Sequence, residues 1–146
     1  MYIILKHAHS GLRWLILIML VWAVFSAILK FIKKSEFTPG DKRTNIIVLS
    51  LAHTQLILGL ILYFISPKVV FGTDTMSNSI LRFFTVEHIS LMIIALVLIT
   101  IGYSKSKKAK TDAKKFRHIF LFYGIALLLI LVAIPWPWMR LASGWV

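Results

Sequence analysis

Residues 12–31 read LRWLILIMLVWAVFSAILKF, a stretch in which only Arg13 and Lys30, near its two ends, are charged. A transmembrane helix needs about 20 largely apolar residues to cross about 30 Å of hydrocarbon. The stretch therefore predicts a membrane-spanning helix. It lacks the preceding short apolar segment and small-residue cleavage site of a signal peptide, so we expect the helix to be retained.

The remainder of the chain contains three more apolar stretches of similar length. We predict spans at about residues 10–32, 45–65, 80–103 and 116–136. Hydrophobic residues make up 59% of the 146 residues, and a mean hydropathy of +0.85 is too apolar for a soluble domain of this size. Short connections favour an up-and-down bundle. The expected fold is all-α, one domain of four transmembrane helices.

Local signals mark the ends of these helices. Asp41, after the turn at Pro39, is a candidate cap for the second helix, and Asn78 or Ser79 is a candidate cap for the third. Pro67 ends the second span, because proline does not continue the backbone hydrogen-bond ladder.

The basic residues are concentrated in two connections. Twelve of the seventeen Lys and Arg residues lie after the first and third spans, within residues 30–43 and 105–117. Cytoplasmic loops carry an excess of Lys and Arg. We therefore predict a multi-pass protein of the bacterial inner membrane, with both termini on the non-cytoplasmic side. The net charge of +12 reflects loops that meet lipid head groups. No nucleic-acid-binding module is recognisable, so we expect no nucleic-acid partner.

All five histidines lie within or beside the predicted spans. His7 and His9 precede the first span, His53 lies in the second, and His88 and His118 open the third and fourth. Ionisable residues in a membrane are costly, and they usually face the bundle interior or mark a function. One interpretation is interhelical hydrogen bonding. The other, which one histidine on each helix favours, is ligation of a cofactor.

The residue types restrict that cofactor. The chain has no cysteine, which excludes iron–sulfur clusters, zinc–cysteine sites and covalent c-type heme attachment. Neutral imidazole binds zinc, copper, nickel and heme iron. A b-type heme needs only two histidines from facing helices and an apolar slot, for which Gly59, Ala52, Ala95 and Gly124 supply small side chains.

Helix geometry suggests which histidines can meet. At about 1.5 Å per residue, His88 and His9 are within about 5 Å in depth, and His7 is about 3 Å further out. His7 and His9 differ by about 200° around a helix, so only one of them can point inward. The outer pair is thus His88 with His7 or His9. We expect one heme b, bound by the outer pair. An inner pair, His53 and His118, differs more in depth, and a second heme would depend on this pair.

Charged residues near the outer ends of the spans are candidates for the heme propionates. Arg13, Arg82 and Arg140 can each bind a carboxylate in two places. Each can equally extend to the lipid interface. Glu87 is the one carboxylate near a span; it can pair with Arg82 or Arg13, bind a quinol hydroxyl, or lie in the interface.

Three motifs resemble a known family. EHISLM (residues 87–92) before a long apolar run and a Lys-rich loop, FRHIF (residues 116–120) and HTQLILG (residues 53–59) are similar to the heme A synthase family. The chain resembles one four-helix half of those proteins. HSGLRW (residues 9–14) and IPWP (residues 134–137) also resemble short bacterial b-type cytochrome-like membrane proteins. The synthase segment Glu-x-x-His-Arg is absent, so the resemblance implies heme binding rather than synthase chemistry.

The sequence therefore leaves two functions open. The first is a bis-histidine b-type membrane cytochrome that transfers single electrons, from a quinol or a periplasmic donor protein. The second is a heme-free accessory or assembly subunit of a larger membrane complex, with homo-oligomers also open. A stand-alone enzyme has less support, because no nucleophile–base constellation, phosphate loop or carboxylate pair is present.

Overall fold

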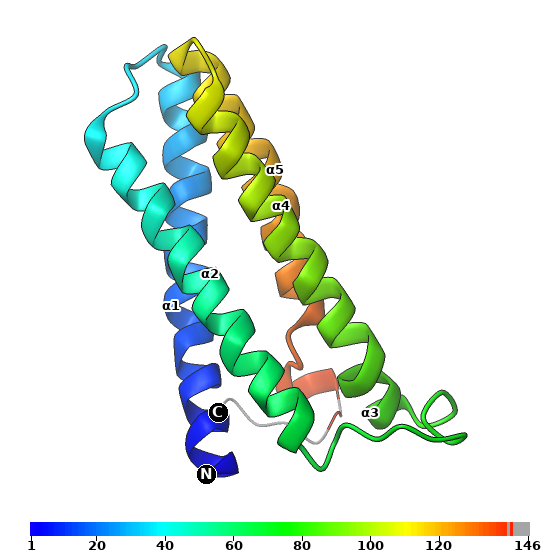
Figure 1. The fold of residues 1–146 in the computed structure, drawn as a ribbon. Coiled ribbons are helices and arrows are strands. Elements are labelled where there is room, and N and C mark those ends of the chain that lie inside the picture. Colours follow the sequence, from blue (N-terminus) through cyan, green and yellow to red (C-terminus); the bar gives the residue numbers. More distant parts are fainter. Residues whose placement is uncertain (140, 142–146) are drawn as a thin grey trace.

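The computed structural model describes residues 1–139 and 141. Its long elements are α1 (Tyr2–Ile32), α2 (Pro39–Ile65), α4 (His88–Lys108) and α5 (Asp112–Ala133). A short helix α3 (Ser79–Arg82) and a π-helical turn η1 (Phe83–Glu87) lead directly into α4, and a 3-10 turn η2 (Pro137–Met139) follows α5. Throughout the described residues the fold is all-α, as the sequence predicted (Figure 1).

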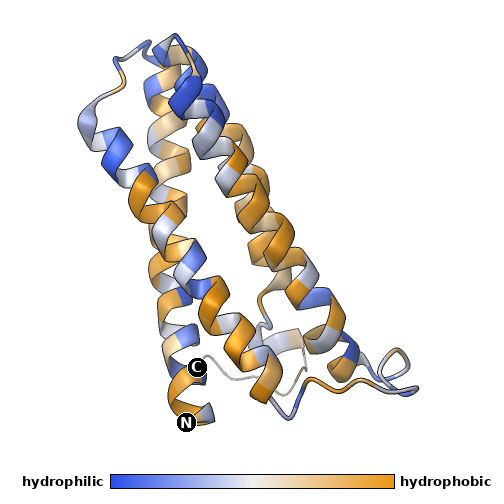
Figure 2. Cartoon of the chain, in the orientation of Figure 1, coloured by the Kyte–Doolittle hydropathy of each residue, from blue (hydrophilic) through white to orange (hydrophobic). Residues whose placement is uncertain are grey.

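Among the described residues, four stretches of helix are long and apolar enough to cross a membrane: α1, α2, α3 through α4, and α5. Their outer surfaces are also apolar, since Phe64 is 81% exposed and Ile18 is 65% exposed. A soluble monomer rarely presents so much apolar surface, whereas lipid matches it. Figure 2 shows hydrophobic residues along the helices and hydrophilic residues gathered at one end. The chain is therefore a multi-pass membrane protein.

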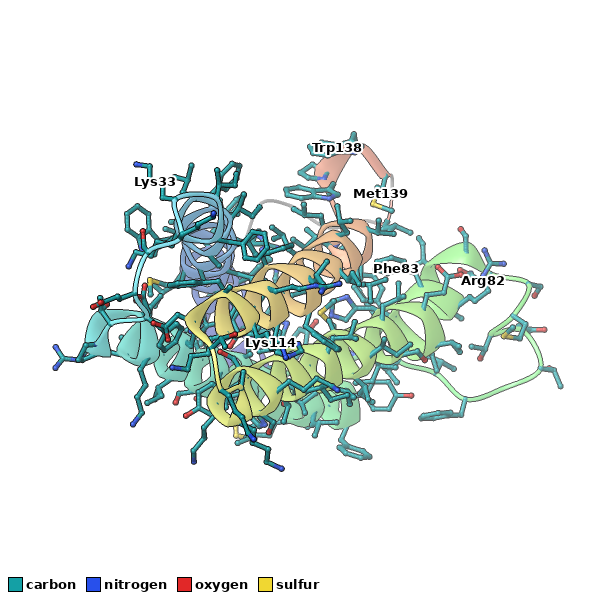
Figure 3. The ribbon with its side chains drawn as sticks, turned by 90° about the horizontal axis from the view of Figure 1, so that it is seen from above. Lys33, Arg82, Phe83, Lys114, Trp138 and Met139 are labelled. Carbon is teal, nitrogen blue, oxygen red and sulfur yellow. The ribbon has the colours of Figure 1, made fainter. Side chains whose placement is uncertain are left out.

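The long helices form a bundle in which α1 contacts α2, α2 contacts α4, α4 contacts α5, and α5 contacts α1. Accordingly, α1 faces α4 across the bundle. Both basic connections lie at one end, and the N-terminus and the last turn of α5 lie at the other (Figure 1). Figure 3 looks down on the basic end, where Lys33 and Lys114 are labelled.

The buried core occupies the half of the bundle nearer the basic connections. Leu20, Val48, Ile99, Phe116 and Tyr123 are each no more than 2% exposed there. In that half α4 and α5 approach closely at Gly102, where a Cβ atom would lie 2.6 Å from the Cβ atom of Phe122. The other half also contains buried residues, among them Phe83 and Ala133, but there the helices enclose a cavity.

α2 begins at Pro39, before the predicted span, because its N-terminus is capped. Thr38, rather than Asp41, is the N-cap of α2: its hydroxyl accepts from the Asp41 amide, and Asp41 accepts in return from the Thr38 amide at 2.9 Å. This reciprocal arrangement is a capping box, so Asp41 acts from the third position of the helix. Asn78 caps α3 by accepting from the amides of Ile80 and Leu81, in agreement with one of the two predicted caps.

Candidate functional site: a cavity with two histidines

The half of the bundle away from the basic connections contains a partly open cavity of about 220 Å³. All four long helices contribute to its wall. Most of the wall is apolar, with Leu56 from α2, Met92 from α4 and Ile130 from α5. Two histidines lie in it, His9 from α1 and His88 from α4. A largely apolar cavity with a few convergent polar groups is typical of a ligand site.

His9 and His88 face each other across the bundle. Their ring centres are 6.4 Å apart and their planes are inclined by 70°. Because α1 and α4 are diagonal neighbours, both side chains extend into the centre rather than along a helix–helix contact. The structure therefore brings together one of the two outer pairs that the sequence left open, with His9 as the partner of His88.

The orientation of His88 is held by a backbone carbonyl that Pro137 leaves without its helical donor. Nδ1 of His88 donates to the carbonyl oxygen of Ala133 at 2.7 Å. In a continuing helix that oxygen would accept from residue 137, which is a proline and has no N–H. The carbonyl of Leu131 lacks its donor for the same reason, because residue 135 is proline, and it accepts from the indole N–H of Trp136 at 2.8 Å.

This hydrogen bond selects the tautomer of His88. A carbonyl oxygen only accepts, so Nδ1 of His88 carries the proton and Nε2 is left as an acceptor or metal ligand. Metal-binding histidines usually donate their second ring nitrogen to a carboxylate or a backbone carbonyl in the same way. The ring of Phe83 packs beside His88, with ring centres 5.9 Å apart.

A π-helical turn lies directly before His88. Such turns are rare and occur frequently at functional sites, because they shift the register of the residues on either side. Here the turn is anchored to its neighbours: the hydroxyl of Tyr63 donates to the Thr85 carbonyl at 2.8 Å, and the Val70 amide donates to the Thr85 hydroxyl at 3.2 Å. The start of α4, with His88, is thereby attached to α2 and to the following connection.

His9 is held from its backbone side by α2. The side-chain amide of Gln55 donates to the His9 carbonyl at 2.8 Å. Gly59, one turn further along α2, lies against the ring: a Cβ atom there would be 3.2 Å from Cε1 of His9. Nδ1 of His9 and Oε1 of Gln55 are buried and have no hydrogen-bond partner within the described residues. Both atoms are thus enclosed between α1 and α2.

Cationic side chains also line this cavity. They are Lys6 and Arg13 from α1, and Lys68 from the connection after α2. Burial, and then the nearby charge of Lys6, lower the pKa of Lys68 below its ordinary value. An anionic group at this position would relieve the repulsion between the two ammonium groups. Arg13, one of the residues predicted to bind a propionate, lies in the wall of the cavity.

Arg82 is placed differently. Its Nε donates to Oε1 of Glu87 at 2.7 Å, and both side chains are about two-fifths exposed. Arg82 does not line the cavity, and Figure 3 shows it at the periphery of the molecule. Of the partners considered for Glu87, the structure thus selects Arg82. Arg140 lies outside the described residues.

The other histidines lie elsewhere. His7 is exposed on α1. His53 is exposed on α2, and its Nδ1 donates to the Leu49 carbonyl of its own helix at 2.8 Å. His118 lies near the start of α5 beside Phe122, with ring centres 6.3 Å apart. No ring contact joins His53 to His118 in the described part of the chain, so the structure does not bring the proposed inner pair together.

The sequence analysis did not identify Lys6, Tyr63 and Lys68 as lining residues. Lys6 lies three residues before His9, which itself lies four residues before Arg13, so the three share one face of a helix and this spacing could have identified Lys6. No pattern in the neighbouring sequence identifies Tyr63 or Lys68. Among the small residues expected beside a flat ring, Gly59, Ala52 and Ala95 line the cavity, whereas Gly124 does not.

Within residues 1–139 and 141, no three His, Cys, Asp or Glu side chains gather as a metal site would require. The site therefore offers two imidazoles rather than a zinc-type cluster. Comparison with known proteins gave no match: no family model fits the chain, and neither a curated protein nor a solved structure matches it.

Proposed function

We propose that this protein is a b-type membrane cytochrome in which His9 and His88 bind one heme. The observation that carries the proposal is the separation of the two rings, whose centres are 6.4 Å apart inside an apolar cavity. Two imidazoles from facing helices at this separation would hold a heme iron between them. This arrangement supports bis-histidine ligation.

The surrounding residues support the same ligand. Gly59 leaves space beside His9, and the hydrogen bond from His88 to Ala133 leaves Nε2 available to a metal. Nδ1 of His9 makes no hydrogen bond within the described residues, so no other group fixes the tautomer of this ring through that atom. Lys6, Arg13 and Lys68 would receive the two propionates. Arg82 has no part in this assignment.

When bound, a heme with two imidazole ligands supplies one-electron transfer and leaves no iron position for oxygen. The protein supplies the two ligands, their orientation and an apolar surrounding. The bond to the Ala133 carbonyl increases the basicity of His88 as a ligand. We place the protein in the bacterial inner membrane with the cavity on the non-cytoplasmic side, where a quinol or a periplasmic protein would exchange electrons with it.

The heme-free accessory subunit is the second candidate, and the bond between His88 and Ala133 favours it too. This contact joins α4 to the end of α5 and is by itself a sufficient structural reason for a buried histidine. The two functions are distinguished by what the cavity binds.

The test is the optical spectrum of the purified protein before and after dithionite, with heme counted per chain. We expect a sharp reduced α-band and one heme per chain, because one histidine pair is brought together. His88→Ala and His9→Ala should each lose the heme while the protein remains inserted in the membrane.

His7→Ala and His53→Ala are the controls, because both side chains are exposed on the helix surface and line no part of the cavity. They should keep the heme. A wild-type protein that stays colourless after heme is added would reject the cytochrome and favour the accessory subunit. Two hemes per chain, with the second lost in His118→Ala, would show that the inner pair also forms.

A further inference from the structure

A second cavity lies at the opposite end of the bundle, beside the basic connections. Its volume is about 360 Å³, within the range of small-molecule sites. Its wall is made by α1, α2 and α5, with Trp22 and Phe116 among the lining residues. No histidine lines this second cavity, which is therefore separate from the cavity with the two histidines.

Asn45 is the distinctive residue of this second cavity. It is only 5% exposed and it lines the cavity. Its amide is not among the enclosed side-chain atoms that lack a partner, so within the described residues it reaches the cavity and can contact a ligand there. An amide offers both donors and an acceptor, and a ligand with carbonyl or hydroxyl oxygens would satisfy them.

The charges of the second cavity favour a neutral ligand. Lys30 is the one cationic side chain in its wall, and Nζ of Lys30 is 2.6 Å from Oδ1 of Asp41, which also lines the wall. Because the two charges compensate each other, an anionic phosphate would find no uncommitted cation there. The hydroxyl of Thr44 is likewise committed, since it donates to the Gly40 carbonyl at 3.1 Å.

The surroundings favour a ligand that is dissolved in the membrane. Trp22 lines the second cavity and is 63% exposed on the outer surface of α1, so the cavity is continuous with the surface that meets lipid. Phe25, three residues further along, is 61% exposed and extends this apolar surface. A polar head could lie beside Asn45 in the cavity, with an apolar tail along the exposed side chains of α1.

We propose that the second cavity binds the neutral, oxygen-bearing ring of a quinone-type membrane amphiphile, with Asn45 as its hydrogen-bonding residue. Binding at this site does not depend on heme in the cavity with the two histidines. The competing occupant is a phospholipid, whose phosphate would be drawn by the positive connections rather than by the compensated wall.

The experiment uses the full chain in lipid nanodiscs and a photoreactive azido-benzoquinone with a decyl tail. Crosslinked peptides are identified by mass spectrometry. We expect labelling of peptides that contain Trp22 or Asn45, displaced by excess decyl-benzoquinone and not by short-chain phosphatidylglycerol. Asn45→Leu, which keeps the volume and removes the amide, should weaken binding about tenfold.

Thr54→Val is the matched control on the same helix, because Thr54 is exposed and donates to the Ser50 carbonyl of α2 itself. It should bind as the wild type does, and so should His88→Ala, which separates this proposal from the heme proposal. Equal labelling of Asn45→Leu, displacement by phosphatidylglycerol alone, or labelling that nothing displaces would each overturn the quinone assignment.

Discussion

At the scale of single residues, Gly59 shows how one missing side chain shapes the cavity with the two histidines. It lies on α2 one turn beyond Gln55, and a Cβ atom at this position would be 3.2 Å from Cε1 and 3.7 Å from Nδ1 of His9. The first distance is shorter than an ordinary van der Waals contact. Any larger residue must therefore displace the His9 ring by a few tenths of an ångström.

We predict that Gly59→Ala lowers heme affinity about tenfold, because ligand orientation controls metal binding. The measurement is a heme titration of the apoprotein, followed by absorbance. Gly11→Ala is the control: Gly11 lies in α1, and no neighbouring atom comes within 4 Å of a Cβ atom there. Equal affinities for the two variants would mean that the position of His9 is not critical.

At the scale of helices, the contact between α4 and α5 depends on Gly102. A Cβ atom on this residue would lie 2.6 Å from Cβ of Phe122 and 3.3 Å from the ring of Tyr123. The first of these atoms is attached to the backbone of α5 and cannot rotate away. The two helices can therefore adopt this spacing only with glycine at position 102.

We predict that Gly102→Ala destabilises the protein by about 1–3 kcal/mol, the usual cost of overpacking a core. Gly124→Ala is the matched control on α5, since nothing lies within 4 Å of a Cβ atom there. It should be neutral or stabilising by up to about 1 kcal/mol, because alanine favours helix more than glycine does. Thermal unfolding in detergent, followed by circular dichroism, compares them; equal midpoints would contradict the close approach.

At the scale of the whole molecule, the two basic connections lie at one end and the N-terminus at the other (Figure 1). The positive-inside rule assigns the basic end to the cytoplasm. Because the natural chain has no cysteine, single cysteines report sidedness without background labelling.

We expect Glu36→Cys and Lys110→Cys, in the two basic connections, to react with an impermeant maleimide only after the cells are permeabilised. Ser77→Cys, in the exposed connection before α3, should react in intact cells. The reverse pattern would place both termini in the cytoplasm, and it would move the cavity with the two histidines to the cytoplasmic side.

The hydropathy and spacing of residues in the sequence were sufficient to predict the local features of this protein. Apolar runs of membrane length predicted the four spans, and Asn78 was correctly among the predicted caps, because both features depend on residues close together in the chain. The same local reasoning limited the outer pair to His88 with His7 or His9. It misassigned the cap of α2, where Thr38 and Asp41 share the role.

Only the tertiary structure could select His9, since the rotation of α1 about its axis depends on how α2 and α5 pack against it. It also removed Arg82 from the cavity and gave His88 its partner at Ala133, 45 residues further along the chain. Likewise, only the structure shows that Asn45 lines the second cavity, which α1, α2 and α5 form together. Hydropathy depends on each residue alone, whereas these features depend on distances between residues far apart in the chain.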